Sequence, residues 1–409
     1  MYKCVVVGKG MIGSAAAKYL SHAGDGIATI GPDEPTDWKS HDGVFSSHYD
    51  AGRITRILDT EYVWALAAKR SIEAYPVIEE KSGIKFFEPR GCVKVVPDDA
   101  QGHAYLDANE ANGNKLGAVT QRTADADLKA RWSFLQFPEK SIGVWEQKTA
   151  GIIDPRKLVA AQLVLAKQNG TDIVNDTVVK ITRVADGRFD LETLAGKRYE
   201  SEKVIVAAGG FTNCHNLLPH RLDIRPRKET VQLARITDEY AKEIASMPSV
   251  IWFLHGHPNL TYVYVLPPIK YPDGKYYVKM GGDREMAFEF TELKQLIDWF
   301  HSSGGEEAAR DFKALMEQLL PNMKAEEWIS KPCVITDTKT ERPYIGPIEP
   351  NLFVATGGCG AAAKSSDEFG RIAALYALGQ SEPSYGNDPF PVVFDGGSNV
   401  RDMARQFKF

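Results

Sequence analysis

The sequence predicts an α/β protein, an α+β arrangement of two domains interleaved along the chain. One domain is of Rossmann type around a parallel sheet, and the other is antiparallel and rich in strands. Two observations lead to this prediction. A buried strand, a glycine-rich turn and a helix follow one another at residues 4–20, and the same order returns at residues 351–378. Residues 226–283 are rich in strand-forming segments such as TYVYVLP and KYYVKMGG.

The bulk composition excludes several classes of protein. The 409 residues are 43% hydrophobic and 25% charged, and the formal net charge of -5 argues against a nucleic-acid partner. The five cysteines form no C-x-x-C pair and no zinc spacing, so we expect a reducing compartment and no metal site. We find no secretory leader and no long apolar span, so we expect a cytoplasmic protein without a membrane partner.

The first element is the strand in CVVVGKGMIGSAAAKYL, residues 4–20, followed by G-x-G-x-x-G at Gly8, Gly10 and Gly13. The first glycine permits a tight turn, the second lets a pyrophosphate approach, and the third allows close packing of helix on strand. Exposed amides at the helix N-terminus favour phosphate charge. This stretch therefore predicts a dinucleotide site.

The second strand, in GIATIGPDEP, departs from the dinucleotide pattern at its end. An acidic residue is expected there to bind the ribose hydroxyls. The position holds Gly31, while Asp33 and Glu34 come slightly later, so the ribose contact stays unassigned.

The middle of the chain alternates helices and strands. We expect helices at residues 62–83, 154–168, 293–305 and 306–321, and strands at 91–99, 172–184, 189–210 and through 226–283. Strands that lie far apart in sequence then have to assemble into one parallel sheet.

The segment SSHYDAGRITRILD, residues 46–59, places Arg53 and Arg56 three positions apart. On a helix this spacing puts both guanidinium groups on one face, where like charges repel unless an anion lies between them. The alternative is an ordinary solvated helix face. The two arginines alone do not decide between these interpretations.

Five motifs in order make the chain resemble the D-amino-acid-oxidase-like flavoproteins, and within them the monomeric sarcosine oxidase group. They are the N-terminal glycine motif, SHYDAGRITR, the lysine in YYVKMGG, PCVITDTKTERPYIG and GGCGAAAKSS. The resemblance implies FAD bound in an extended form, with the substrate between the flavin and a β-rich cap domain. The implied FAD-binding domain is 1–88, 150–225 and 330–385, the substrate-binding domain is 89–149 and 226–329, and 386–409 is a tail.

The resemblance also implies roles for single residues. Arg56 and Lys364 match residues that hold the substrate carboxylate, and Arg53 matches one beside the flavin ring. Cys333 matches the cysteine that attaches FAD covalently, and Lys279 matches a lysine that activates oxygen. The implied cofactor-binding residues are Gly8, Gly10, Met11, Ile12, Gly13, Ser46, Ser47, His48, Arg53, Val179, Cys333, Gly358, Gly360 and Lys364.

Two departures from the sarcosine oxidase group concern the substrate. Asp283 replaces a histidine, so it could meet a cationic group of the substrate or pair with Arg284. Gly360 and the small residues 361–363 replace a Gly-His-Gly-Phe run, which implies a roomier pocket. Sarcosine itself is therefore not the favoured substrate.

The resemblance implies an FAD-dependent oxidase of a carboxylate-bearing, N-substituted amino acid that reduces O₂ to H₂O₂. The alternatives are a dehydrogenase with another electron acceptor, a nicotinamide dehydrogenase with the same glycine motif, and a flavin-binding protein without turnover. The expected partners are a small amine substrate and oxygen, and the expected assembly is a monomer or a small homo-oligomer.

Overall fold

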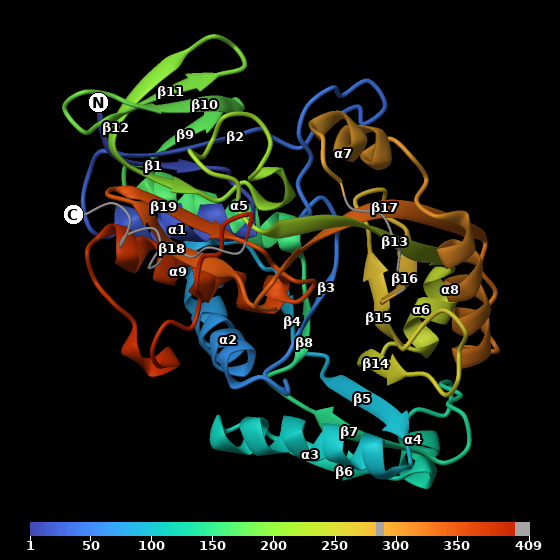
Figure 1. Cartoon of the computed structure of the whole chain (residues 1–409). Helices are drawn as coiled ribbons and strands as arrows, with labels where there is room; N and C mark the ends of the chain where they lie inside the picture. The colour runs from blue at the N-terminus through green and yellow to red at the C-terminus, as the bar shows by residue number, and fades with distance from the viewer. Residues whose placement is uncertain (284–289, 397–409) are drawn as a thin grey trace.

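The computed structural model describes residues 1–283 and 290–396, and it builds them around two large sheets that lie in separate parts of the molecule (Figure 1). The first sheet has the order β10-β11-β12-β1-β2-β9, and β19 joins the same sheet beside β12. Strands β1, β2, β9, β12 and β19 run parallel. The bounds are β1 (Tyr2–Val7), β2 (Ile27–Gly31), β9 (Asp172–Asn175), β10 (Val178–Arg183), β11 (Phe189–Thr193), β12 (Arg198–Val206), β18 (Tyr344–Glu349) and β19 (Leu352–Thr356).

Helices from four distant segments pack together beside this sheet (Figure 1). Their buried faces meet the apolar strands in one core, which includes Val6, Leu20, Leu158, Ile205 and Phe369. Burial of such side chains supplies most of the folding free energy of a layered domain. The helices are α1 (Met11–Ser21), α2 (Tyr62–Ser82), α5 (Pro155–Gln168) and α9 (Ser366–Ala377).

The second sheet has the order β17-β13-β16-β15-β14-β5-β7-β6 and is antiparallel except where β14 meets β5. One of its faces packs against α8 in a core that includes Trp252, Val278 and Phe312. The bounds are β5 (Cys92–Pro97), β6 (Thr120–Thr123), β7 (Ser141–Glu146), β13 (Ile224–Ile236), β14 (Ser249–Phe253), β15 (Tyr262–Lys270), β16 (Tyr276–Gly282) and β17 (Glu327–Thr338), with α3 (Ala100–Lys115), α4 (Asp125–Arg131), α6 (Asp238–Glu243), α7 (Leu293–Phe300) and α8 (Glu306–Leu319).

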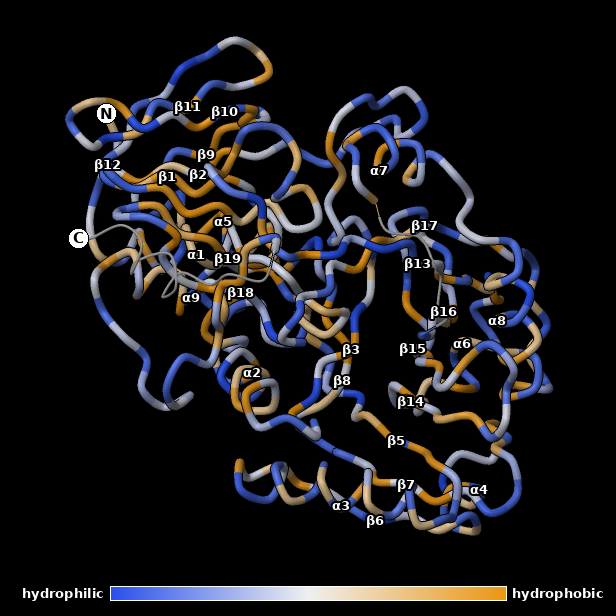
Figure 2. Tube along the Cα trace, viewed as in Figure 1, coloured by the Kyte–Doolittle hydropathy of each residue, from blue (hydrophilic) through white to orange (hydrophobic). Residues whose placement is uncertain are grey.

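A small third sheet, β3-β8-β4, lies between the two larger sheets (Figure 1). Hydrophobic segments gather in strands such as β5, and hydrophilic ones in the outer loops (Figure 2). The bounds are β3 (Arg53–Thr55), β4 (Phe87–Glu88) and β8 (Gly151–Ile153), and short 3-10 turns are η1 (Gly209–Phe211), η2 (Ala362–Ser365) and η3 (Pro383–Tyr385).

The mixed α/β fold with parallel and antiparallel sheets confirms the predicted fold class. Arg53 starts strand β3 and is therefore not on a helix. Lys279 lies on β16, which runs between β13 and β15 in the interior of the second sheet. β17 spans residue 330, where the expected domain boundary falls, and pairs within the second sheet.

Candidate active site

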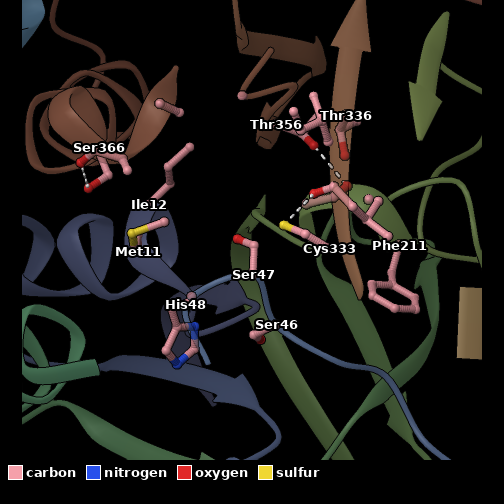
Figure 3. Close-up of a pocket in the computed structure, with 18 of the residues that line it drawn as sticks. Met11, Ile12, Ser46, Ser47, His48, Phe211, Cys333, Thr336, Thr356 and Ser366 are labelled. Atoms are coloured by element: carbon pink, nitrogen blue, oxygen red, sulfur yellow. Dashed lines mark hydrogen bonds between the residues drawn. The ribbon is translucent and has the colours of Figure 1, made fainter. Parts of the chain in front are cut away.

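A cavity of about 390 Å³ lies where the two large sheets face each other. Its walls come from the N-terminus of α1, residues 44–56, strands β13, β15 and β17, and the turn after β19. Figure 3 shows Met11, Ile12 and His48 on one side of this space and Cys333 and Phe211 on the other. The cavity thus brings together segments from nearly the whole length of the chain.

The glycine motif forms one end of the cavity. Gly8 has φ +102°, and a Cβ on Gly13 would meet the Gly8 carbonyl oxygen at 1.9 Å. Both glycines are therefore required for helix α1 to start against β1. Gly10 caps the helix without a side-chain hydrogen bond, and Met11 and Ile12 line the cavity, so the first amides of α1 are available to a phosphate.

His48 lies beside this helix end and is buried. Its Nδ1 has no hydrogen-bond partner among the residues that the structure describes. Burial, with Arg156 and Arg53 nearby, lowers the pKa of His48 to about 3, so the ring is neutral at neutral pH. A buried polar nitrogen of this kind calls for a partner that the protein does not supply. Together with the free helix end, it fits a bound nucleotide.

The acidic candidates for a ribose contact are already engaged by cations. Asp33 forms an ion pair with Lys9, and Glu34 accepts two hydrogen bonds of 2.6 Å from Arg156. A Cβ on Gly31 would approach the Lys9 amide nitrogen to 2.7 Å, so glycine is needed there. Neither carboxylate lines the cavity, and the ribose contact stays unassigned.

A buried cluster of charged side chains forms around Asp50, where β16 meets the segment before β3. Lys279 on β16 is 0% exposed, and its Nζ donates to Asp50 Oδ2 and to the Gly52 carbonyl, both at 2.6 Å. Arg53 pairs with the same carboxylate, and Tyr271 donates to it at 2.8 Å. Burial lowers the pKa of Lys279 to about 8, and Asp50 opposes that shift. Arg53 lines the cavity, whereas Lys279 lies just behind the lining residues.

A second buried cluster surrounds Arg56, which follows β3. Its guanidinium lines the cavity, and its Nε is buried without a hydrogen-bond partner within the described part of the chain. The Asp59 Oδ2 atom is 3.8 Å from Arg56 Nη2 and 3.3 Å from Lys364 Nζ. Lys364 is 1% exposed, and burial lowers its pKa to about 8. Lys94, 2% exposed, lies nearby, and burial together with Arg56 lowers its pKa to about 7.

The predicted covalent cysteine lies on the cavity wall. Cys333 is on β17, and the Trp299 indole fixes its backbone by donating to its carbonyl at 2.8 Å. Cys359 lines the same cavity with φ +45°, and its Sγ lies 3.5 Å from the Thr338 hydroxyl.

The remaining predicted residues divide into two groups. Ser46, Ser47, Gly358 and Gly360 line the cavity, as do residues 361–363. Gly13, Val179, Lys364 and Asp283 are not lining residues, although Thr177 and Val178 next to Val179 are. Asp283 accepts from the amides of Thr261 and Tyr262, at 2.9 and 3.0 Å. Its expected partner Arg284 lies outside the described residues.

Sequence reasoning missed several polar residues around these clusters. Asp50 and Asp59 fall within the SHYDAGRITRILD segment, but nothing in the pattern distinguishes them from surface carboxylates. Lys94 interrupts an apolar strand, CVKVVP, and this interruption was an available signal. Glu229 and Tyr264 line the cavity from strands β13 and β15. Nothing in the sequence distinguishes them from other strand residues.

In residues 1–283 and 290–396, no group of three or more metal-binding side chains gathers. No helix in this part of the chain is both long and apolar enough to cross a membrane.

Comparisons with known proteins agree over most of the chain. A family model described as FAD dependent oxidoreductase matches residues 3–375. Monomeric sarcosine oxidase from Arthrobacter sp. (strain TE1826) is 23% identical over 400 residues, which is 93% of this chain and 94% of that protein. N-methyl-L-tryptophan oxidase from Escherichia coli (strain SE11) is 26% identical over 232 residues, 55% of this chain and 57% of that protein.

Solved structures share the fold at low sequence identity. NikD, an amino acid oxidase of nikkomycin biosynthesis, superposes with a TM-score of 0.75 at 20% identity and covers 93% of this chain and 95% of its own. L-proline dehydrogenase from P. horikoshii has a TM-score of 0.73 at 20% identity, with coverage of 95% and 97%. These matches confirm the resemblance that the five motifs predicted.

Proposed function

The chain belongs to the FAD-dependent oxidoreductase family, and on that basis we propose that it is an oxidase of a carboxylate-bearing amino acid with an N-substituted amine. When bound, FAD takes a hydride equivalent from the carbon next to the nitrogen. The imine product is hydrolysed to an amine and a carbonyl compound. Dioxygen is the electron acceptor and is released as hydrogen peroxide.

The observation that carries this proposal is the buried Nε of the Arg56 guanidinium, which lacks a hydrogen-bond partner within the described residues. The ion pair of Arg56 with Asp59 is long at 3.8 Å. A buried donor of this kind is costly unless a ligand satisfies it. The planar fork of arginine matches the two oxygens of a carboxylate. The substrate carboxylate therefore binds at Arg56, with Lys364 adding positive charge behind it.

The cofactor binds along the rest of the cavity. Its pyrophosphate lies at the N-terminus of α1, where the free amides and the helix dipole favour negative charge. Cys333 lines the cavity and would attach the flavin ring covalently, the role that the family resemblance implies. Lys279 and Arg53 would supply the positive charge that stabilises the negative charge developing on oxygen.

Oxidation of the substrate amine requires no side chain of the protein to act as a general base. An amine that enters the cavity in its neutral form gives up a hydride equivalent without a proton acceptor on the protein. Residues 361–363 are small and line the cavity, which leaves room for a substituent larger than a methyl group. We therefore propose a substrate larger than sarcosine.

Anaerobic mixing tests the proposal. The purified protein is mixed without air with N-alkyl amino acids and with the matching amines that lack the carboxylate. We expect the visible flavin absorbance to bleach with the amino acids and far less with the amines, and hydrogen peroxide to form once air is admitted. Bleaching without peroxide would favour a dehydrogenase, and no bleaching with any member of the panel would contradict the proposal.

A further inference from the structure

Cys333 on β17 and Glu229 on β13 are paired directly opposite each other in the antiparallel register of these two strands. Directly opposite residues point to the same face of a sheet, with Cβ atoms typically about 4.5–5.5 Å apart. Both residues line the cavity. The register therefore places a carboxyl group beside the thiol, on the wall where the flavin ring is proposed to bind.

The thiol of Cys333 needs help to lose its proton. Burial raises its pKa, and Glu229 and Asp50 raise it further, while Arg53 and Lys279 act against them. Its Sγ makes only a weak contact, 3.9 Å to the carbonyl of the next residue, Val334. Since the thiolate is the reactive form of cysteine, a buried neutral thiol requires a base within reach.

Glu229 has the surroundings of a proton acceptor. It is 5% exposed, and its carboxylate pairs with Arg227, which also binds Asp337 through Nε at 2.5 Å. Because Arg227 is shared between two carboxylates, it compensates only part of the cost of burying Glu229. Burial raises the pKa of Glu229 to about 8, so its carboxylate form binds a proton more tightly than an ordinary glutamate does.

We propose that Glu229 is the base that accepts the Cys333 thiol proton when this cysteine forms a thioether with the 8-methyl carbon of FAD. The inference rests on the proposed function, specifically on attachment at Cys333. The same cavity contains a second thiol, Cys359, whose Sγ instead lies beside the Thr338 hydroxyl and the Gly357 carbonyl. A carboxylate directly across the strand thus distinguishes Cys333 from Cys359.

Dioxygen is the oxidant in the formation of the thioether. The bond between Sγ and the methyl carbon forms, while the S–H bond and one methyl C–H bond break. The thiol proton goes to Glu229, and the methyl proton and two electrons remain with the ring system. Dioxygen then takes two electrons and two protons, one of them from Glu229, and leaves as hydrogen peroxide. Glu229 returns to its carboxylate form.

The test follows attachment and not turnover. Full-length apoprotein from riboflavin-depleted cells is incubated in air with FAD, and samples are denatured in acid at intervals. Intact mass and flavin fluorescence in denaturing gels count the chains that carry covalent flavin. Visible absorbance before denaturation shows that each variant folds and binds FAD. Cys333→Ala is the control without attachment, and Glu327→Gln, at an exposed carboxylate on the same strand β17, is the matched control.

We expect Glu229→Gln to bind FAD and to attach it more slowly by about 10² or more, the usual contribution of a general base. Glu229→Asp, which keeps the carboxylate, should recover part of the rate, and Glu327→Gln should stay near wild type. If Glu229→Gln does not bind FAD, an unchanged rate in Glu229→Asp would contradict the inference, because the shorter side chain moves the base away from the thiol.

Two results would overturn the inference and are distinguishable from each other. Wild-type attachment with an unimpaired Glu229→Gln would reject Glu229 as the base and leave Cys333 as the attachment point. A wild-type protein that releases all its flavin on denaturation would reject the attachment as well. The anaerobic substrate panel remains an independent test of the proposed oxidase activity in both cases.

Discussion

The charge on Lys279 depends on its buried partners. Asp50 accepts from Lys279 and also pairs with Arg53, so one carboxylate is shared between two cations and one positive charge is left in excess. Both side chains are fixed by backbone carbonyls as well, Lys279 by Gly52 and Arg53 by Ser47 at 2.6 Å. Such a fixed charge stabilises a developing anion without reorganisation.

Replacing Lys279 therefore separates the two half-reactions. Lys279→Met should slow the reaction of the reduced enzyme with oxygen by about 10²–10³, the typical effect of losing one preorganised donor. Anaerobic reduction by substrate should change far less, because that step places no charge on oxygen. Stopped-flow absorbance measures both steps. Lys270→Met, at an exposed lysine on β15, is the matched control, and unimpaired oxygen reaction in Lys279→Met would assign the role to another cation.

The same step should depend on pH. Burial lowers the pKa of Lys279 to about 8 although Asp50 opposes it, so the ammonium is present below pH 8 and is lost as the pH rises through 8. The rate of the oxygen reaction should fall across that range in the wild type and stay flat in Lys279→Met. Stopped-flow traces from pH 6 to 10 give the comparison. A parallel fall in both proteins would point to a different titrating group, such as Lys364.

Arg56 should determine the preference for carboxylate substrates. Arg56→Ala removes a charged hydrogen-bonding partner, which is typically worth about 1.5–3 kcal/mol. We expect a higher KM for N-alkyl amino acids and little change for the matching amines without a carboxylate. Steady-state kinetics on both series measures the shift, and Arg90→Ala, in a loop away from the cavity lining, is the control. Equal effects on both series would contradict the role.

At the scale of elements, the glycines around the α1 turn are not equivalent. A Cβ at Gly13 would meet the Gly8 carbonyl oxygen at 1.9 Å, whereas a Cβ at Gly10 would meet only His48 Nδ1, at 3.9 Å. Gly13→Ala should therefore destabilise the fold by about 1–3 kcal/mol through overpacking and weaken FAD binding. Gly10→Ala should leave folding stability nearly unchanged. Denaturant unfolding and FAD titration of the apoproteins compare the pair, and equal stabilities would show that α1 can shift.

Elements whose signal is local could be predicted from the sequence. The glycine turn depends on a few neighbouring residues, and α2 was expected to end at Gly83, which has φ +72° and caps the helix. Arg53 and Arg56 were placed on a helix because spacing alone does not show that the segment pairs with β8, which is about a hundred residues away in sequence. The central position of the Lys279 strand also depends on distant partners.

The candidate site was predictable only in part, because many of its contacts join residues that are distant in sequence. The five motifs indicated Arg56, Lys279 and Cys333, but the carboxylates that set their charge carry no pattern of their own. Asp50 meets Lys279 across 229 positions of sequence. Glu229 meets Cys333 only through the long register of β13 with β17. Partners of this kind become visible only when the strands are assembled.

At the scale of the whole molecule, α7 contacts the loop before β3 at the wall of the cavity. Phe300 stacks on Phe45 with ring centroids 4.9 Å apart, and both line the cavity. Phe300→Ala should weaken FAD binding and destabilise the fold by about 3–5 kcal/mol. Phe137→Ala, at a buried ring in the second-sheet core away from the cavity lining, should cost similar stability without loss of FAD. FAD titration and urea unfolding distinguish them, and equal FAD affinity would contradict the bridging role.

The strand order of the first sheet also bears on how the protein is made. β1 begins at residue 2, but its neighbour β12 pairs on its far side with β19, which ends at residue 356. A ribosome adding about 5–20 residues per second needs on the order of 20–70 s to make this interval. During that time the nascent N-terminal strand has no completed cofactor site beside it. The complete cavity is therefore available to a cofactor only after residue 356 has been made, so the glycine motif functions long after its own synthesis.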